Sequence, residues 1–535
     1  MLSLWLPPVD PQGQAASNKE KTEMNISRRF FIGGAASFGA FGGCRFLAAP
    51  GFKAGVTPRL RFGVVSDIHI LRVGAKEKMD AFGNNLTFRH TLEWFRAQGV
   101  DAVAIAGDMA DKGMDENLMA VAEAWYSVFP GDKYPDGRPV TKFFITGNHD
   151  WDGFNYGGHA EKRYPDAKER AKHILRKDIA GWWDKAFHEP YTPFSVKQVN
   201  GYTFLGAHWD TGGHGEETGK TVYPFARIEE YMAKNGKALD PKLPFFYVQH
   251  PHPKDTCYGP WAWGHDKGAV TKTLSAYPNA IAFSGHSHYS LTDERSIWQG
   301  AFTSVGTSSL RYTGLPYDER PNEGYENTGA GNRAAWRVDA EKSMKKYSTG
   351  DCRQGMLWSV YDDCIVVRRR EFLSNLDIGE DWVMPLPAAE SKPFAFAAHA
   401  QKVRTPEFSQ GAVPTVVVMK SINRGGKSPD GKESVPSVKK QAFKIVTPPI
   451  APDLKGRLFR LEFTAETPDG KKLVKHVLAA GFNHSEKHKR ALSKQWCYFF
   501  KDELGADKVR FTVTPINCFG ARGKPIVAEW NAPTA

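Results

Sequence analysis

Short apolar runs recur through the first two thirds of the chain and are separated by amphipathic or polar stretches. Five of these runs are five or six residues long, largely apolar and abruptly ended, a pattern typical of buried β-strands. They are Arg61–Ser66, Ala102–Ala106, Lys142–Thr146, Phe245–Gln249 and Ala280–Ser284. The pattern therefore predicts at least five strands with both faces covered.

Amphipathic stretches between the runs predict helices. Asn84–Gln98 has helical periodicity, and Glu116–Phe129 forms a second candidate helix. The residues placed near one face of the first helix are Leu86, His90, Trp94 and Phe95. Because strands alternate with helices, residues 59–372 are predicted to form an α/β layered domain.

The pattern changes after residue 372. Residues 373–395 contain Pro385, Pro387 and Pro393 and are predicted to be a linker or docking strap. Helical periodicity nearly disappears over residues 396–535. Four further strands are predicted there, Thr415–Met419, Leu458–Thr464, Leu473–Leu478 and Val509–Thr514. They favour a smaller C-terminal all-β sandwich domain.

The N-terminus has the features of an export signal. Arg28 and Arg29 precede a glycine-rich apolar run that is too short to span a bilayer, and small residues follow over 47–51. This pattern resembles a bacterial twin-arginine signal, which directs the export of folded protein. Residues 1–50 are therefore predicted to be a leader, and the protein is expected in the periplasm or at the cell envelope. The alternative is a soluble N-terminal helix that carries two arginines.

The cysteines bear on two points, a lipid anchor and disulfide bridges. Cys44 follows Phe41-Gly42-Gly43, which weakly resembles a lipoprotein cleavage box with an atypical first residue, so a lipid anchor at Cys44 is a less favoured alternative. Five cysteines remain after the leader, and an odd number does not complete a disulfide framework. Cys352–Cys364 and Cys497–Cys518 are the predicted bridges in an oxidising compartment.

Length and charge narrow the classes of protein and partner. A chain of 535 residues is too long for one core and predicts two or three domains. The formal net charge of +12 favours anionic partners. Lysine and arginine are spread along the chain without a long basic block, so nucleic acid is not predicted as the main partner.

Metal-binding residue types stand at the ends of the five buried runs. The clusters, in chain order, are Asp67 and His69, Asp108, Asn148, His250, and His286 and His288. Sites in α/β sheets form outside the carboxyl ends of strands, so these clusters are expected to converge. Carboxylate, imidazole and amide ligands suit Mn, Fe or Zn. Gly107, Gly147 and Gly285 precede three of the clusters and allow a sharp bend or a close approach.

The five clusters together resemble the calcineurin-like metallophosphoesterase superfamily. That family is marked by D-x-H, GD-x-x-D, GNH-D/E, a lone His and GH-x-H, and all five motifs occur here in order. The resemblance covers roughly residues 59–372. It implies two mixed β-sheets flanked by helices, with a two-metal centre at one edge.

The resemblance also implies a role for each residue. Asp67, His69, Asp108 and His288 would bind the first metal ion, and Asp108, Asn148, His250 and His286 would bind the second. His149 would contact the scissile phosphate without binding metal, oriented by Asp150. The cofactors would be two divalent or mixed-valence transition metal ions. Asp111 stands where purple acid phosphatases have Tyr, which argues against the Fe(III)-tyrosinate type.

Several other residues allow two interpretations. Asp111 would either orient His69 or His149 or cap its loop. His252, and His208 with Asp210, would either face the site or serve the structure. Tyr258, Trp261 and Trp263 would stack on a base or sugar, or pack on the core. The run His484-Ser485-Glu486-Lys487-His488-Lys489 is interpreted as a solvated basic surface.

The expected function is an exported phosphoesterase that hydrolyses phosphate mono- or diesters by metal-activated hydroxide attack. The substrate would be a phosphorylated small molecule or an envelope phosphoester, and the C-terminal domain would either contact envelope or polysaccharide or brace the catalytic domain. The alternative is a non-catalytic exported binding protein on a metal-stabilised scaffold. Intact His149 argues against that alternative, because metal retention does not need it.

Overall fold

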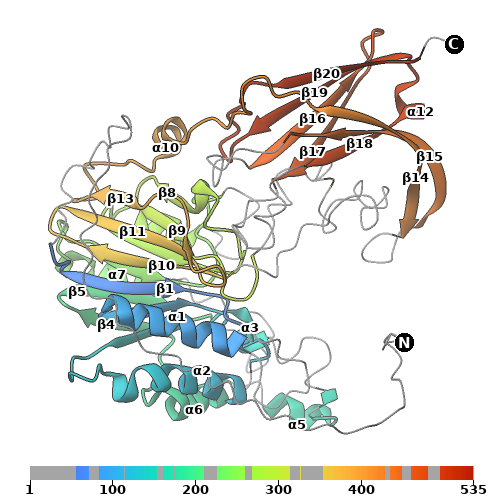
Figure 1. Ribbon diagram of the computed structural model, residues 1–535. Helices are drawn as coiled ribbons and strands as arrows, with labels where there is room; N and C mark the ends of the chain where they lie inside the picture. The colour runs from blue at the N-terminus through green and yellow to red at the C-terminus, as the bar shows by residue number, and fades with distance from the viewer. Residues whose placement is uncertain are drawn as a thin grey trace, which may run out of the picture. The chain divides into compact units, whose positions relative to one another are not determined.

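Two mixed β-sheets form the centre of the α/β domain (Figure 1). The first has seven strands in the order β12-β11-β10-β1-β2-β3, with β13 paired to β11. Its strands are β1 (Leu60–Val65), β2 (Ala102–Ala106), β3 (Thr141–Ile145), β10 (Gln354–Val360), β11 (Cys364–Glu371), β12 (Leu376–Asp377) and β13 (Trp382–Pro385). β1, β2 and β3 run parallel, so their carboxyl ends share one edge.

The computed structural model describes most, but not all, of the chain. The described residues are 56–70, 84–113, 115–152, 161–162, 164–172, 176–209, 226–258, 268–313, 326, 353–427, 434–448, 459–479 and 495–533. The predicted leader and Cys44 therefore lie outside them. Among the helices of these ranges, none is both long and apolar enough to cross a membrane.

The second sheet has six strands in the order β4-β5-β6-β7-β9-β8. Its strands are β4 (Phe194–Val199), β5 (Tyr202–Ala207), β6 (Phe245–Val248), β7 (Ala280–Ser284), β8 (Ile297–Gln299) and β9 (Thr303–Gly306). β5, β6, β7 and β9 are parallel neighbours. The five predicted buried strands are thus confirmed, three in the first sheet and two in the second.

An aromatic core joins the facing sides of the two sheets. The ring of Phe62 on β1 lies 4.7 Å from that of Phe246 on β6 and 5.9 Å from that of Trp358 on β10. All three side chains are fully buried. Burial of large aromatic surfaces is the main favourable contribution to such a core.

Helices cover the outer faces of both sheets. The core of the first sheet's outer face includes residues of α1 (Asn84–Gln98), α2 (Asp115–Val128) and α6 (Arg176–Phe187). α7 (Ala226–Asn235) and α8 (Ala269–Leu274) pack on the second sheet. Shorter elements are α3 (Asn148–Asp152), α5 (Ala167–Lys172), η1 (Pro130–Asp132), η3 (Gly236–Ala238) and η5 (Glu294–Ser296). This helix–sheet–sheet–helix order confirms the predicted fold class.

The row of α1 residues predicted to share one face is only partly the row that packs on the sheet. Phe88, Leu92 and Phe95 are fully buried, whereas Leu86 is 41% exposed and His90 is also exposed. Positions 88, 92 and 95 follow the i, i+4, i+7 spacing of one helical stripe. The helix therefore turns a different row toward the sheet. Of the predicted row, Phe95 and the partly buried Trp94 pack on the same core.

The segment 373–395 is part of the first sheet rather than a separate linker. β13 pairs antiparallel with β11, with Trp382 opposite Val367 and Met384 opposite Ile365. Trp382 and Met384 belong to the core between the sheets. The prolines stand at and beyond the end of β13, where a strand can accept them without losing a ladder hydrogen bond.

The C-terminal domain is an all-β sandwich, as predicted. One sheet has the order β14-β15-β18 and the other β17-β16-β19-β20. The strands are β14 (Thr415–Lys427), β15 (Ser434–Val446), β16 (Arg460–Glu466), β17 (Lys472–Leu478), β18 (Trp496–Phe500), β19 (Lys508–Ile516) and β20 (Ile526–Asn531). Two short helices, α10 (Phe396–Lys402) and α12 (Lys501–Leu504), accompany them. Residues of both sheets, such as Phe443 and Phe511, form one core.

Both predicted disulfides are wrong. Cys364, Cys497 and Cys518 are free and buried. Cys497 packs inside the sandwich core, whereas Cys518 belongs to a small cluster with Phe459 and Leu478, so the two thiols lie in different apolar environments. Since Cys364 is free, it is not bridged to Cys352, which lies outside the described residues.

A buried ionic network holds β11 against its surroundings. The guanidinium of Arg369, 1% exposed, donates to Glu294 Oε1 at 2.8 Å and lies 4.1 Å from the centre of the Trp382 ring. Glu294 also accepts from Trp382 Nε1 at 2.8 Å and lies 3.3 Å from His399 Nε2. Burial alone would raise the pKa of Glu294, but Arg369 and His399 lower it to about 2.

Arg369→Met is expected to lower the free energy of unfolding by about 3–5 kcal/mol at pH 7, because it leaves the Glu294 carboxylate buried without its cation. The native pKa of Glu294 lies below its unfolded value, so its contribution is present at neutral pH and is lost as pH falls toward 2. The deficit of the variant should therefore shrink in acid. Denaturant unfolding across pH measures both effects.

Arg368→Met is the matched control. Arg368 lies on the same strand, is 43% exposed and makes only long ion pairs, 3.9–4.0 Å, with Asp377 and Asp381. Its loss should cost less than about 1 kcal/mol. Equal destabilisation by the two substitutions would contradict the role given to the buried network.

Candidate metal centre

All seven predicted metal ligands meet at one edge of the α/β domain. The loops that carry them follow β1, β2 and β3 of the first sheet and β6 and β7 of the second. The parallel strands of each sheet end at the same edge, and the shared core fixes the two sheets together. Their role as ligands stays a prediction, but their convergence is a property of the fold.

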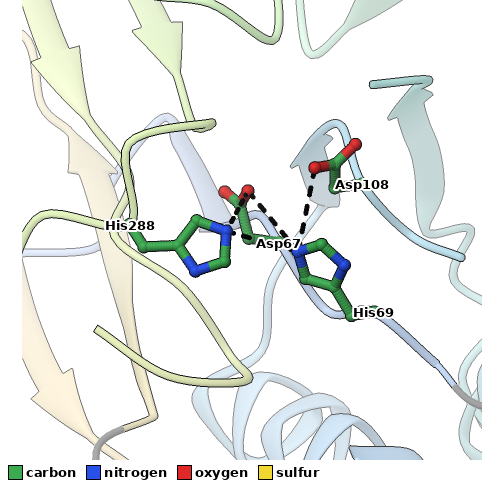
Figure 2. A group of neighbouring side chains, drawn as sticks. All are labelled: Asp67, His69, Asp108 and His288. Carbon is green, nitrogen blue, oxygen red and sulfur yellow. Dashed lines mark hydrogen bonds and ion pairs between the residues drawn. The ribbon is translucent and has the colours of Figure 1, made fainter. Parts of the chain in front are cut away.

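Four side chains form the first group (Figure 2). His288 Nε2 lies 2.9 Å from Asp67 Oδ1 and 3.3 Å from His69 Nε2. His69 Nε2 lies 3.9 Å from Asp67 Oδ1 and 3.7 Å from Asp108 Oδ2. Two imidazoles and two carboxylates thus point their free atoms at one small volume.

Asp108 also belongs to a second group. His250 Nε2 lies 3.1 Å from Asp108 Oδ2, and His286 Nδ1 lies 3.3 Å from His250 Nε2. The amide oxygen of Asn148 lies 3.0 Å from His286 Nδ1. Asp108 is therefore the one described carboxylate that both groups share, which is the position of a bridging ligand.

The arrangement of ring nitrogens and carboxylate oxygens is suited to a bound cation. His250 Nδ1 donates to the carbonyl of Ala106 at 2.8 Å, and His288 Nδ1 donates to the carbonyl of Tyr312 at 2.9 Å. These bonds leave the Nε2 lone pairs of the neutral rings facing the carboxylates. Acceptors turned toward acceptors in a buried place need a positive charge between them, which a metal ion would supply, or a proton on the ring in its absence.

The backbone of the site is held in a conformation that few non-glycine residues adopt. Five of the seven residues have positive φ, between 47° and 69°, and these are Asp67, His69, Asp108, His286 and His288. Non-glycine residues in this region cost on the order of 1–3 kcal/mol each unless their surroundings enforce it. The strain lies at the site and shows that the fold, not local preference, sets the ligand directions.

Glycines make the close packing of the ligands possible. A Cβ on Gly107 would collide with the imidazole of His250, and one on Gly285 would collide with the carboxylate of Asp67. A Cβ on Gly147 would meet the carboxylate of Asp108. The close approach predicted for these three glycines is confirmed, and Gly107 also needs its φ of 90°.

The carboxylates create a strongly negative environment. Burial would raise the pKa of Asp67, but His288 and His250 lower it to about 2. His250 and His69 likewise hold the pKa of Asp108 well below its usual value, against the effect of burial. Burial lowers the pKa of His250, but Asp108 and Asp67 raise it to about 9. The site thus stabilises positive charge at the atom expected to bind metal.

His149 lies beside the two groups without joining the ligand contacts above. Its backbone N–H donates to Asp108 Oδ1 at 2.8 Å, and its Nδ1 donates to the carbonyl of Asp111 at 3.1 Å. The ring packs edge-on against His69, with 4.5 Å between centroids. A non-ligand role would turn the other ring nitrogen, Nε2, toward a substrate.

The contacts of the Asp150 carboxylate are with main-chain amides, and the expected orientation of His149 by Asp150 stays a prediction. Its buried carboxylate accepts from the backbone N–H groups of Gly147 at 2.7 Å, Ala110 at 2.7 Å and Met109 at 3.3 Å. Burial and Asp108 raise the pKa of Asp150 to about 7, partly offset by these amides. Asp150 therefore ties the loop after β3 to the loop after β2 and so positions the predicted ligands that these loops carry.

Asp111 lies beside His69, as one of the two predicted alternatives requires. Its Oδ1 lies 3.5 Å from His69 Nδ1, and the carboxylate also pairs with Arg311 and, at 3.0 Å, with Lys112. Burial would raise the pKa of Asp111, but His69 and Arg311 hold it well below its usual value. His69, Asp111 and His149 could geometrically hold a cation, but the paired Arg311 and Lys112 oppose one there.

The loop 307–313 after β9 is part of the site and was missed by the sequence analysis. Ser309 Oγ donates to the carbonyl of Asp67 at 3.0 Å and accepts from the backbone of Arg311 and Tyr312. The Tyr312 ring lies 4.4 Å from that of His288. The available signal was Gly306, a glycine directly after a short strand-like run, as Gly107, Gly147 and Gly285 are.

The two histidines with open interpretations are structural. His208 is buried and contacts Thr146 and Ser195, and burial lowers its pKa to about 3. His252 Nδ1 and Nε2 each lie 2.6 Å from a hydroxyl, those of Ser284 and Ser287. His252 thus braces the loop that carries His286.

The contacts of Tyr258 distinguish between its two interpretations. Tyr258 is 4% exposed and donates to the carbonyl of Tyr289, which supports packing on the core. Asp210, Trp261, Trp263 and the run from His484 to Lys489 lie outside the described residues.

Comparison with known proteins agrees with the geometry. Residues 60–290 match the family model described as calcineurin-like phosphoesterase. A comparison with curated proteins gave no match. The family match spans the loops of all seven predicted ligands and ends before the loop 307–313.

Solved structures resemble the chain only distantly. A dimetal phosphatase from Danio rerio is 13% identical, with a TM-score of 0.33, over 61% of this chain and 99% of that one. A purple acid phosphatase from yellow lupin, Lupinus luteus, is 10% identical, with a TM-score of 0.35, over 61% of this chain and 53% of that one. Scores this low support no conclusion about activity. The match identifies one part of the chain: residues 60–290 match the calcineurin-like phosphoesterase family, and the two sheets to which they belong continue to β13.

Proposed function

We propose that the protein is an exported phosphoesterase that uses two metal ions to hydrolyse phosphate mono- or diesters. The observation that carries the proposal is the shared position of Asp108, which lies within 3.7 Å of His69 Nε2 and 3.1 Å of His250 Nε2. One carboxylate between two ligand groups is what a two-ion centre requires. The family match of residues 60–290 supports the same chemistry.

The residues divide into two metal positions. Asp67, His69, Asp108 and His288 would hold the first ion, and Asp108, Asn148, His250 and His286 the second. Their imidazole, carboxylate and amide atoms suit Mn, Fe or Zn. When bound, such ions polarise a phosphate ester and supply a nucleophile near neutral pH.

Groups of the chain itself would orient the ligand rings and supply a proton to the leaving group. The carbonyls of Ala106 and Tyr312 fix the His250 and His288 rings through Nδ1. The carboxylate of Asp111 lies 3.5 Å from Nδ1 of His69 and would orient that ring. His149, held through Nδ1, presents Nε2 and in its cationic form would donate a proton to the leaving oxygen. A role as proton donor would explain why His149 is present although both ligand groups are complete without it.

A panel of two chromogenic esters tests the proposal. The purified protein, reconstituted with Mn, Fe or Zn, is assayed with p-nitrophenyl phosphate and bis-p-nitrophenyl phosphate. Hydrolysis of at least one ester that depends on added metal is the expected result. Metal binding without hydrolysis of either ester would favour the non-catalytic scaffold instead.

We further propose that the protein is exported in its folded state. The seven ligands span Asp67 to His288 and come together only when both sheets have formed. A route that carries folded protein would let the centre be loaded in the cytoplasm, away from competing ions.

Replacing Arg28 and Arg29 with Lys should trap folded, metal-loaded precursor inside the cell. Fractionation, followed by activity and metal analysis of each fraction, checks this expectation. Unchanged export of the Lys-Lys variant would show that the arginine pair is incidental. Metal-free, unfolded precursor would contradict loading before export.

A further inference from the structure

The hairpin of β14 and β15 is longer than the rest of its sheet, and Figure 1 shows it as a long, curved ribbon. Each of the two strands has 13 residues, but β18 pairs only with residues 442–446 of β15. Among the described strands, residues 434–440 of β15 therefore have β14 on one side and no strand on the other. This half of the hairpin is a two-stranded ribbon, which gains little stability from its own pairing.

The hairpin shows apolar side chains to solvent. Ala442 is fully buried in the core of the sandwich, and Ile422 on β14 lies in the same core. Val438, four residues before Ala442, is 44% exposed. Val417 and Val418 on the edge strand β14 are 39% and 43% exposed. Three valines of one hairpin are thus available for an apolar contact.

The same hairpin concentrates positive charge. Residues 415–446 include seven basic and two acidic residues, so this short segment supplies +5 of the formal net charge of +12. The two strands themselves contain six basic residues and no acidic residue. The six are Lys420, Arg424, Lys427, Lys439, Lys440 and Lys444. The basic residues are spaced along the sequence without forming a block, and antiparallel pairing brings those of β14 alongside those of β15.

Two of these lysines have no acidic partner in the part of the chain that the structure describes. Lys420 and Lys439 are exposed, whereas Lys440 lies 2.9 Å from Asp502 of α12. Lysine on an edge strand also discourages pairing with another sheet. That protection accounts for the lysines alone, but exposed valines beside them would favour association.

We propose that the β14–β15 hairpin binds the surface of a bilayer that contains anionic lipids. The lysines would meet the headgroup phosphates, and the valines would enter the boundary between headgroups and acyl chains. A membrane offers a negative potential and an apolar layer to the same ribbon, whereas the outer surface of a nucleic acid offers the negative charge alone. The inference goes beyond the proposed function, because it gives a partner to a part of the chain outside the ligand groups.

Vesicle sedimentation with the metal-reconstituted full chain tests this partner. Vesicles of phosphatidylcholine alone are compared with vesicles that also contain phosphatidylglycerol. Binding to the anionic vesicles is expected to be at least about tenfold tighter at low salt and to weaken as salt is raised, because salt screens the headgroup charge. Equal binding to both kinds of vesicle, or binding to neither, would overturn the proposal.

Charge reversal on the hairpin is compared with the same reversal elsewhere. Lys420→Glu combined with Lys439→Glu should lower the affinity for anionic vesicles at least about tenfold. Lys472→Glu combined with Lys508→Glu is the matched control, since both lysines are exposed on β17 and β19 of the other sheet. The control should change the affinity less than about twofold. Lys420→Gln combined with Lys439→Gln serves if the glutamate variant does not fold, with a smaller loss in the same direction.

Val438→Ser tests the apolar contact without changing the charge. It should weaken vesicle binding about threefold or more, because it removes an aliphatic group that the bilayer would bury. A double-stranded DNA oligonucleotide, measured in the same buffers, should bind more weakly than the anionic vesicles and respond little to this substitution.

Two further results would contradict the assignment. Equal losses in the hairpin variant and its control would show that net charge alone drives binding. DNA bound as tightly as the anionic vesicles would make a nucleic acid the partner. Hydrolysis of p-nitrophenyl phosphate should be unchanged in all these variants, because none of them alters the ligand groups, so the proposed activity and this inference can fail separately.

Discussion

Asp108→Ala is expected to reduce bound metal below two ions per chain and to abolish ester hydrolysis. Asp108 Oδ2 faces His69 in one ligand group and His250 in the other, so its loss removes a ligand from both. The two-ion clamp contributes several kcal/mol to such reactions, so the rate should fall by more than about 10³-fold. Metal analysis and the ester assay measure the two effects separately.

The controls for this prediction separate chemistry from folding. Asp108→Asn keeps the size of the side chain and one oxygen, and serves if the alanine variant is unstable. Asp362→Ala, an exposed aspartate, should retain metal and activity. Two fully occupied ions together with retained activity in Asp108→Ala would contradict the two-ion centre.

His149→Gln should leave metal content intact and lower kcat by about 10²-fold or more. The reason is geometric, because Nδ1 of His149 donates to the carbonyl of Asp111 and the ring packs edge-on against His69. Glutamine can keep a hydrogen bond but cannot supply a proton near neutral pH. Metal analysis and single-turnover kinetics on the same preparation distinguish the two roles.

His90→Gln, an exposed histidine on α1, is the matched control for this substitution. Loss of metal in His149→Gln would mean that His149 is a ligand. Unchanged kcat would remove its proposed role as proton donor.

Much of the α/β domain was predictable because its strands are buried on both faces. Runs such as Ala102–Ala106 are apolar without interruption and match β2 residue for residue. The face of α1 was only partly predictable because Leu86 is apolar yet exposed, a choice made by packing rather than by pattern. β12 and β13 were missed because prolines stand at the end of β13 and suggested a linker.

The positions of the ligands were predictable for a related reason. Parallel strands share their carboxyl edge, so polar clusters at five strand ends had to approach one another. The contacts of Asp150 and Arg311 were not predictable. They join loops from distant parts of the chain, and the sequence does not show which backbone amides or carboxylates those side chains will meet.

The imidazole orientations have a consequence for engineering the centre. The choice between Nδ1 and Nε2 in His250 and His288 is made by main-chain carbonyls, those of Ala106 and Tyr312. A carbonyl cannot be removed by substitution, so these two rings would keep the same coordinating nitrogen in every point mutant that preserves the loops. Efforts to retune metal selectivity have to work through His69, whose orienting partner Asp111 is a side chain and can be exchanged.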